Sequence, residues 1–173
     1  MSTIQTDARV YVGTYAKYNS GSIAGKWLDL SDYSDRDAFL EACRELHTDE
    51  SDPELMFQCF EGFPRAWYCE SSAPPEILWE WLELEESERL AFAVYAEHYG
   101  DGAEIEGFRE AWQGRWACGA DFAEHIAEEC GEIPKDLPTW IVIDWEASWN
   151  CNLRHDYFEA DDAEGNNHIF RRM

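Results

Sequence analysis

The stretch PPEILWEWLELEESERLAFAVYAEHYG, residues 74–100, decides our interpretation of the fold. In its first half, apolar side chains recur at the three-and-four spacing of a helix face, at Ile77, Leu78, Trp81 and Leu82. In its second half, Ser87 is a suitable N-cap and Gly100 can supply a left-handed helix end. One side of this second helix is formed by Ala91, Val94, Tyr95 and His98. The stretch therefore predicts two consecutive amphipathic helices joined near residues 85–87.

Glutamates occupy the outer faces of this predicted helix pair. Glu76 and Glu80 are four residues apart, and Glu83 follows one turn later. Like charges at this spacing cost an isolated helix about 0.2 to 0.5 kcal/mol per pair, so these acids do not serve helix stability. A solvated helix face is the ordinary explanation of one such run. The same pattern recurs in residues 119–131, however, which favours a function for the acids.

The net charge restricts the class of partner. The 173 residues include 37 acids and 13 bases, a formal net charge of −24. Phosphate binding depends on clustered Lys and Arg, so nucleic acid and anionic membrane surfaces are excluded as direct partners. We expect a basic protein or a cation instead. Adaptation to high salt would also give an acidic surface, but it does not explain nine Trp, nine Phe and eight Tyr in one chain.

The sequence shows no pattern of a membrane span or of a signal peptide, and its cysteines form no CxxC pair. No apolar run approaches the roughly 20 residues of a membrane span, and MSTIQTDARV lacks the order of a signal peptide. We therefore expect a cytoplasmic protein. The six cysteines include no CxxC pair, and we expect mostly buried free thiols.

The N-terminal part predicts a small sheet with one helix. Residues 8–15, 25–30 and 55–62 have the composition of short strands. Between the second and third strands, Ser34 can cap a helix with Asp37 at the capping-box position, and we expect His47 to interact with the C-terminal end of that helix.

The C-terminal part predicts a mixed helix and strand region. Residues 100–107 predict a loop or short turn, and Phe108, Ala111 and Trp112 then lie at helical spacing before Gly114. Residues 119–131 predict a helix that begins near Asp121. The signals conflict from Leu137 onward, and we place a helix from about Asp144. DYFEA and HIFRR then predict a hairpin around the turn DAEGNN.

Motifs for catalysis are missing from the sequence. The histidines form no HxH or HExxH arrangement, and DDAEGN at residues 161–166 lacks EF-hand spacing and is interpreted as a turn. The chain has no GxSxG, phosphate loop or GxGxxG. Among 37 acids, pairs of carboxylates occur everywhere and carry no specificity for a hydrolase. We expect a binding protein with no catalytic residue, no metal and no cofactor.

Several motifs follow one another in a fixed order. They are VYVGTYAKYNSGSIAGKWLDL from residue 10, EGFP from residue 61, LELEESERLAFAVYAEHYG from residue 82, GADFAEHIAEECG from residue 119, IDWEA from residue 143, and the terminal DYF and HIF. In this order they resemble the motifs of the ArdA-type antirestriction proteins. The resemblance implies an elongated α+β protein of three small domains, usually a homodimer, whose acids imitate DNA phosphates and which occupies the DNA-binding groove of type I restriction-modification enzymes. With the boundary signals near residues 62–74, we expect an N-terminal small antiparallel sheet with one helix over 1–62, a central acidic helical domain over 63–103 and a C-terminal mixed domain over 104–173.

The physical chemistry of the chain supports the same function. B-DNA presents one charge per roughly 1.7 Å of axis, so 24 net charges match about 40 Å of duplex. The candidate partner-binding acids are Glu76, Glu80, Glu83, Glu86, Asp101, Glu104, Asp121, Glu124, Glu128 and Glu132. The alternatives are an acidic adaptor or chaperone-like module for another basic protein and, third, a carboxylate hydrolase.

Overall fold

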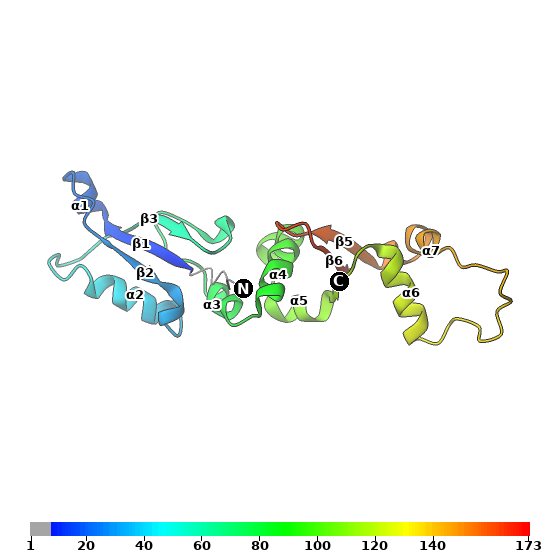
Figure 1. Ribbon diagram of the computed structural model, residues 1–173. Helices are drawn as coiled ribbons and strands as arrows, with labels where there is room; N and C mark the ends of the chain where they lie inside the picture. The colour runs from blue at the N-terminus through cyan, green and yellow to red at the C-terminus, as the bar shows by residue number, and fades with distance from the viewer. Residues whose placement is uncertain (1–7) are drawn as a thin grey trace, which may run out of the picture. The chain divides into compact units, whose positions relative to one another are not determined.

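The computed structural model describes residues 8–173 (Figure 1). The start of MSTIQTDARV, which shows no signal-peptide pattern, lies outside the described residues. The chain has the predicted α+β class and forms two compact units, whose boundary falls between Leu84 and Glu85. The division into three domains stays a prediction. Within residues 8–173, no helix is both long enough and apolar enough to cross a membrane.

The first unit contains the predicted three-stranded sheet. Strands β1 (Arg9–Thr14), β2 (Lys26–Asp29) and β3 (Leu55–Glu61) are antiparallel in the order β2-β1-β3. Val10 and Val12 are buried on either side of a half-buried Tyr11, as their alternation predicts. The short helix α1 (Tyr15–Asn19) follows β1 directly.

Helix α2 (Arg36–Glu45) and helix α3 (Ile77–Leu82) share an aromatic core with this sheet. The Phe39 ring lies 6.1 Å from Phe57 of β3 and 5.9 Å from Trp79 of α3, centroid to centroid. The indole N–H of Trp79 donates to the carbonyl of Leu30 at 3.2 Å. Two 3-10 turns complete the unit, η1 (Leu30–Asp32) and η2 (Arg65–Trp67).

The cap of α2 is one residue later than the sequence predicts. Asp35, not Ser34, is the N-cap, and its carboxylate accepts from the backbone N–H of Ala38 at 2.8 Å. This bond, with a second from the Ser34 hydroxyl, lowers the pKa of Asp35. His47 also differs from expectation: it is buried, with ring contacts to the Lys17 ammonium and the carbonyl of Val12 in place of the helix end.

The second unit opens with α4 (Glu86–Tyr99), the second helix of the predicted pair. Its N-cap is Glu85, and Ser87 lies inside the first turn. Glu85 and Glu88 form a reciprocal capping box, so the prediction of Ser87 as the N-cap is wrong. Gly100 ends the helix with a positive φ of 65°, which glycine permits, but its ψ of −143° lies outside the left-handed helical region that the sequence predicted.

The next segment corrects two predictions. After the 3-10 turn η3 (Gly100–Gly102), helix α5 (Ile105–Ala111) begins where we expected only a loop. Trp112 continues the helical spacing but starts strand β4 (Trp112–Arg115), which pairs with β6 (Asn167–Arg171) more than 50 residues later. Local periodicity carries no information about such a distant partner.

The second sheet has the order β4-β6-β5, and the predicted hairpin joins β5 (Tyr157–Asp161) to β6. Phe170 of β6 packs near Tyr95 of α4 and Phe108 of α5. Ile169, one residue earlier and on the opposite face, packs in a cluster with Phe122 and Trp149. This cluster lies between the sheet and helices α6 (Gly119–Glu129) and α7 (Trp145–Cys151), which is followed by the 3-10 turn η4 (Leu153–His155).

The segment between α6 and α7 resolves the conflict from Leu137 onward. It contains neither helix nor strand until Asp144, which caps α7 by accepting from the backbone N–H of Ala147 at 2.8 Å, as predicted. Trp140 and Val142 of this segment are 81% and 87% exposed.

The cysteine prediction is partly wrong: all six are free thiols, but only Cys43 is buried.

Candidate acidic partner-binding surface

The first group of candidate acids follows α3. Glu76 is the N-cap residue, Glu80 lies one turn on and Glu83 is the C-cap residue. At about 100° per residue these three point to one side of the helix, whereas Leu78 and Trp81 are buried on the other. All three glutamates are exposed. They form a short carboxylate row on a helix whose other face is fixed in the core of the first unit.

Glu86, Asp101 and Glu104 belong to the second unit and do not form one cluster. Glu86 opens α4, whereas Asp101 lies two residues beyond the end of the helix at Tyr99, so the helix rise separates the two by about 20 Å. Asp101 lies in η3 and Glu104 is the N-cap residue of α5. All three are exposed.

The second row of carboxylates follows α6. Asp121, Glu124 and Glu128 lie on one side of this helix, at successive rises of about 4.5 and 6 Å. Phe122 and Ala123 are buried on the other side, so packing against Trp149 and Ile169 orients the row. Glu132 lies beyond the helix end, in the loop that follows Gly131. The expected continuous stripe of Glu124, Glu128 and Glu132 is therefore helical only as far as Glu128, although all four acids are exposed.

Basic residues are scarce around both rows. Residues 76–86 include five glutamates and no Lys or Arg, and residues 119–132 include five acids and no Lys or Arg. Several ion pairs join acids outside the ten candidates, such as Arg9 with Glu61 and His125 with Glu129. The two segments therefore carry net negative charge on exposed side chains.

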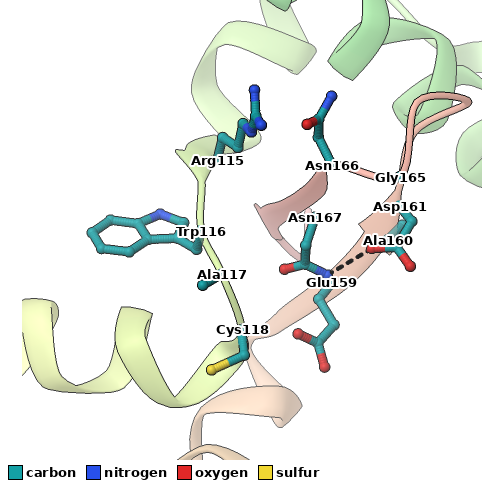
Figure 2. A pocket seen from close by; sticks show the side chains of 10 residues that line it. All are labelled: Arg115, Trp116, Ala117, Cys118, Glu159, Ala160, Asp161, Gly165, Asn166 and Asn167. Carbon is teal, nitrogen blue, oxygen red and sulfur yellow. Dashed lines mark hydrogen bonds between the residues drawn. The ribbon is translucent and has the colours of Figure 1, made fainter.

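Two polar sites of the second unit were not predicted from the sequence. One is a hollow beside the β5–β6 hairpin (Figure 2), where Glu159 and Asp161, two residues apart, lie on the same face of β5. The other is a buried pair in which the ring Nε2 of His168 lies 2.8 Å from a carboxylate oxygen of Asp162. Strand alternation could have indicated the first site, but the second depends on the fold of the turn.

The buried pair is a structural feature of the hairpin. The indole N–H of Trp112 donates to Nδ1 of His168 at 3.3 Å, so the ring hydrogen is on Nε2 and points to Asp162. Asp162 also accepts from the side chain of Asn166 and from the backbone N–H groups of Glu164 and Asn166. Burial would raise the pKa of Asp162, but these donors prevail and lower it to about 2. The residues of DDAEGN thus form the predicted turn.

Neither row resembles a metal centre. Within residues 8–173, no group of three or more His, Cys, Asp or Glu side chains is placed to hold a metal ion. What the rows can do chemically is attract and bind cationic groups.

The fold and surface define a class, an acidic α+β protein that displays carboxylates on packed helices. A comparison with protein families then gives the family: the model described as "Antirestriction protein (ArdA)" matches residues 10–163. The chain belongs to the ArdA family of antirestriction proteins. A comparison with curated proteins found no match.

Proposed function

We propose that this protein inhibits type I restriction-modification enzymes by occupying their DNA-binding groove as a mimic of duplex DNA. Membership of an antirestriction family gives the biological role. The observation that carries the mechanism is the pair of carboxylate rows on α3 and α6, with no Lys or Arg in residues 76–86 or 119–132.

The rows suit a groove that has evolved to bind phosphates. Successive carboxylates along α6 rise by about 4.5 to 6 Å, and the phosphates of one B-DNA strand rise by about 3.4 Å, so both rows of charge have spacings of a few ångströms. Because packing holds both helices, little conformational entropy is lost when the enzyme binds the carboxylates. The protein acts as an inhibitor and not as an enzyme.

We also propose a homodimer, formed through the second unit. Trp140, Ile141 and Val142 are three consecutive exposed apolar residues, which is the kind of surface that self-association covers. Two subunits of net −24 repel each other, so the dimer should weaken at low salt. Light scattering of the wild type and of the variant Trp140→Ser/Val142→Ser across salt concentrations tests this; a wild-type monomer at every salt concentration contradicts it.

The inhibitor itself is tested by competition for a type I methyltransferase bound to labelled duplex DNA. We expect the protein to displace the duplex and not to bind the duplex itself. If it binds the enzyme without displacing DNA, the adaptor alternative holds. Tight binding to free duplex at physiological salt contradicts mimicry.

A further inference from the structure

His47 is a buried titratable residue of the first unit that the proposed function does not use. Its side chain lies in the turn after α2 and the residue is only 2% exposed. Both ring nitrogens are engaged: Nδ1 lies 2.8 Å from Nζ of Lys17, and Nε2 lies 3.3 Å from the carbonyl oxygen of Val12. The ring therefore connects the turn to helix α1 and to strand β1.

The two partners fix the hydrogen of the ring. An ammonium group only donates and a carbonyl oxygen only accepts, so Nδ1 accepts from Lys17 and the ring hydrogen is on Nε2. This is a neutral tautomer of histidine. An imidazolium would carry a second hydrogen on Nδ1, which would face the ammonium hydrogens of Lys17 and place two positive charges next to each other. The observed contact is therefore specific for the neutral ring.

The other charged groups around the ring hold the ammonium in place. Nζ of Lys17 lies 2.9 Å from a carboxylate oxygen of Asp49 and 3.7 Å from one of Glu50. The hydrogen bond from Lys17 lowers the pKa of Asp49, and Glu50 also accepts from the buried hydroxyl of Thr14 at 2.6 Å. On the side of α2, burial raises the pKa of Cys43 to about 12, so that thiol stays neutral. Both carboxylates thus contact the ammonium that faces the ring.

The segment that Lys17 connects to this turn is α1 with the loop that follows it, residues 15–25, which we call the N-terminal tip. The backbone N–H groups of residues 20–22 donate to carbonyls of α1 at 2.8 to 3.2 Å. Two apolar side chains of the tip, Tyr18 and Ile23, are 53% and 75% exposed. The contacts of Lys17 therefore help to position a segment that presents apolar surface to solvent.

We propose that the contact between Lys17 and His47 is a pH-sensitive latch on the N-terminal tip. The latch is closed while the ring is neutral, and uptake of a proton by the ring releases Lys17 and loosens α1. Imidazole groups change their charge between pH 8 and pH 5. Because the closed form excludes the proton and the opened form accepts it, a fall in pH favours the opened form. The latch is independent of the proposed function, and either can fail without the other.

Amide hydrogen exchange of residues 17–22 at pH 7.5 and pH 5.5 tests the latch. His47→Gln is the matched variant, because an amide oxygen can accept from Lys17 and an amide N–H can donate to Val12, but the group takes up no proton. Dividing the wild-type rate by the variant rate at the same pH removes the intrinsic pH dependence of exchange. A solvent-exposed histidine has a pKa of about 6.5, so an opened form that alone binds the proton becomes about tenfold more populated over this interval. We expect the ratio of rates to rise about tenfold.

Two further variants assign the effect to the contact. In a Lys17→Met background the closed form can accept the proton, so the same ratio should change by less than about twofold. His155→Gln removes an exposed histidine of the second unit and should leave the rise of the wild type intact. A ratio that stays constant from pH 7.5 to pH 5.5, or an equal rise in the Lys17→Met background, overturns the latch.

A second measurement needs no variant. The nitrogen chemical shifts of the His47 ring distinguish its two neutral tautomers from the imidazolium. We expect the neutral form with its hydrogen on Nε2 at pH 7.5 in the wild type. A ring with its hydrogen on Nδ1, or an imidazolium at this pH in the folded protein, contradicts the donor role of Lys17 and overturns the proposal.

Discussion

At the scale of single residues, Asp162 shows how a buried carboxylate is kept charged. Its pKa of about 2 lies below the usual 3.8, so its charged form stabilises the folded state at any pH above 3.8, and this contribution is lost as the pH falls toward 2. The shift corresponds to about 2 kcal/mol.

Asp162→Asn removes the negative charge of the carboxylate that accepts hydrogen bonds from His168 and from the backbone N–H groups of the turn. We expect the variant to lose about 2 to 4 kcal/mol of unfolding free energy at pH 7, and the loss to shrink below pH 3.8. Urea denaturation between pH 2.5 and 7 measures this, with the exposed Glu164→Gln of the same turn as control. A loss independent of pH would show that shape, not charge, matters here.

Cys69 and Cys43 represent the two extremes among the thiols. Hydrogen bonds from Ser71 and Ser72 lower the pKa of the exposed Cys69 to about 7, whereas burial raises that of Cys43 to about 12. Because the thiolate is the nucleophile, iodoacetamide should modify Cys69 with a rate that rises through pH 7 and should leave Cys43 unmodified in the folded protein. Peptide mass spectrometry after timed alkylation measures both. A Ser71→Ala/Ser72→Ala variant in which Cys69 reacts equally fast at pH 7 would contradict the assignment.

At the scale of elements, the sequence predicted what local periodicity encodes. The helix pair of residues 77–99, the hairpin of residues 157–171 and the start of α7 agree with their patterns. Strand β4 was missed because only its pairing with β6 distinguishes it from the end of a helix. The rows of acids could be predicted from helical spacing, whereas the hollow depends on strand register and on a wall from another element.

The position of α6, and therefore of its carboxylate row, depends on one close contact. A Cβ on Gly119 would lie 2.3 Å from the ring of Trp149, a buried side chain of α7. We expect Gly119→Ala to lower the unfolding free energy by about 1 to 3 kcal/mol. Gly102→Ala, where a Cβ meets nothing within 4 Å, should change it by less than about 0.5 kcal/mol. Urea denaturation of both proteins tests this, and equal stabilities would mean that Trp149 moves aside freely.

At the scale of the whole molecule, binding should be distributed over the rows. An exposed ion pair contributes about 0 to 1 kcal/mol, so Glu80→Gln, Glu83→Gln, Glu124→Gln or Glu128→Gln should each weaken inhibition less than about tenfold. The losses of binding free energy from substitutions in separate rows should add when the substitutions are combined. Titration of the methyltransferase with single and multiple variants measures this. One such change that abolishes inhibition in a folded protein would indicate a specific site in place of phosphate mimicry.

The most direct test of DNA mimicry is the salt dependence of binding to the methyltransferase. A protein that replaces phosphates pairs its carboxylates with many Lys and Arg side chains, so log K should fall steeply and linearly with log salt. We predict that the slope becomes shallower with each Glu→Gln substitution in the rows on α3 and α6, measured by isothermal titration calorimetry at several salt concentrations. A wild-type affinity that does not change with salt would contradict the account.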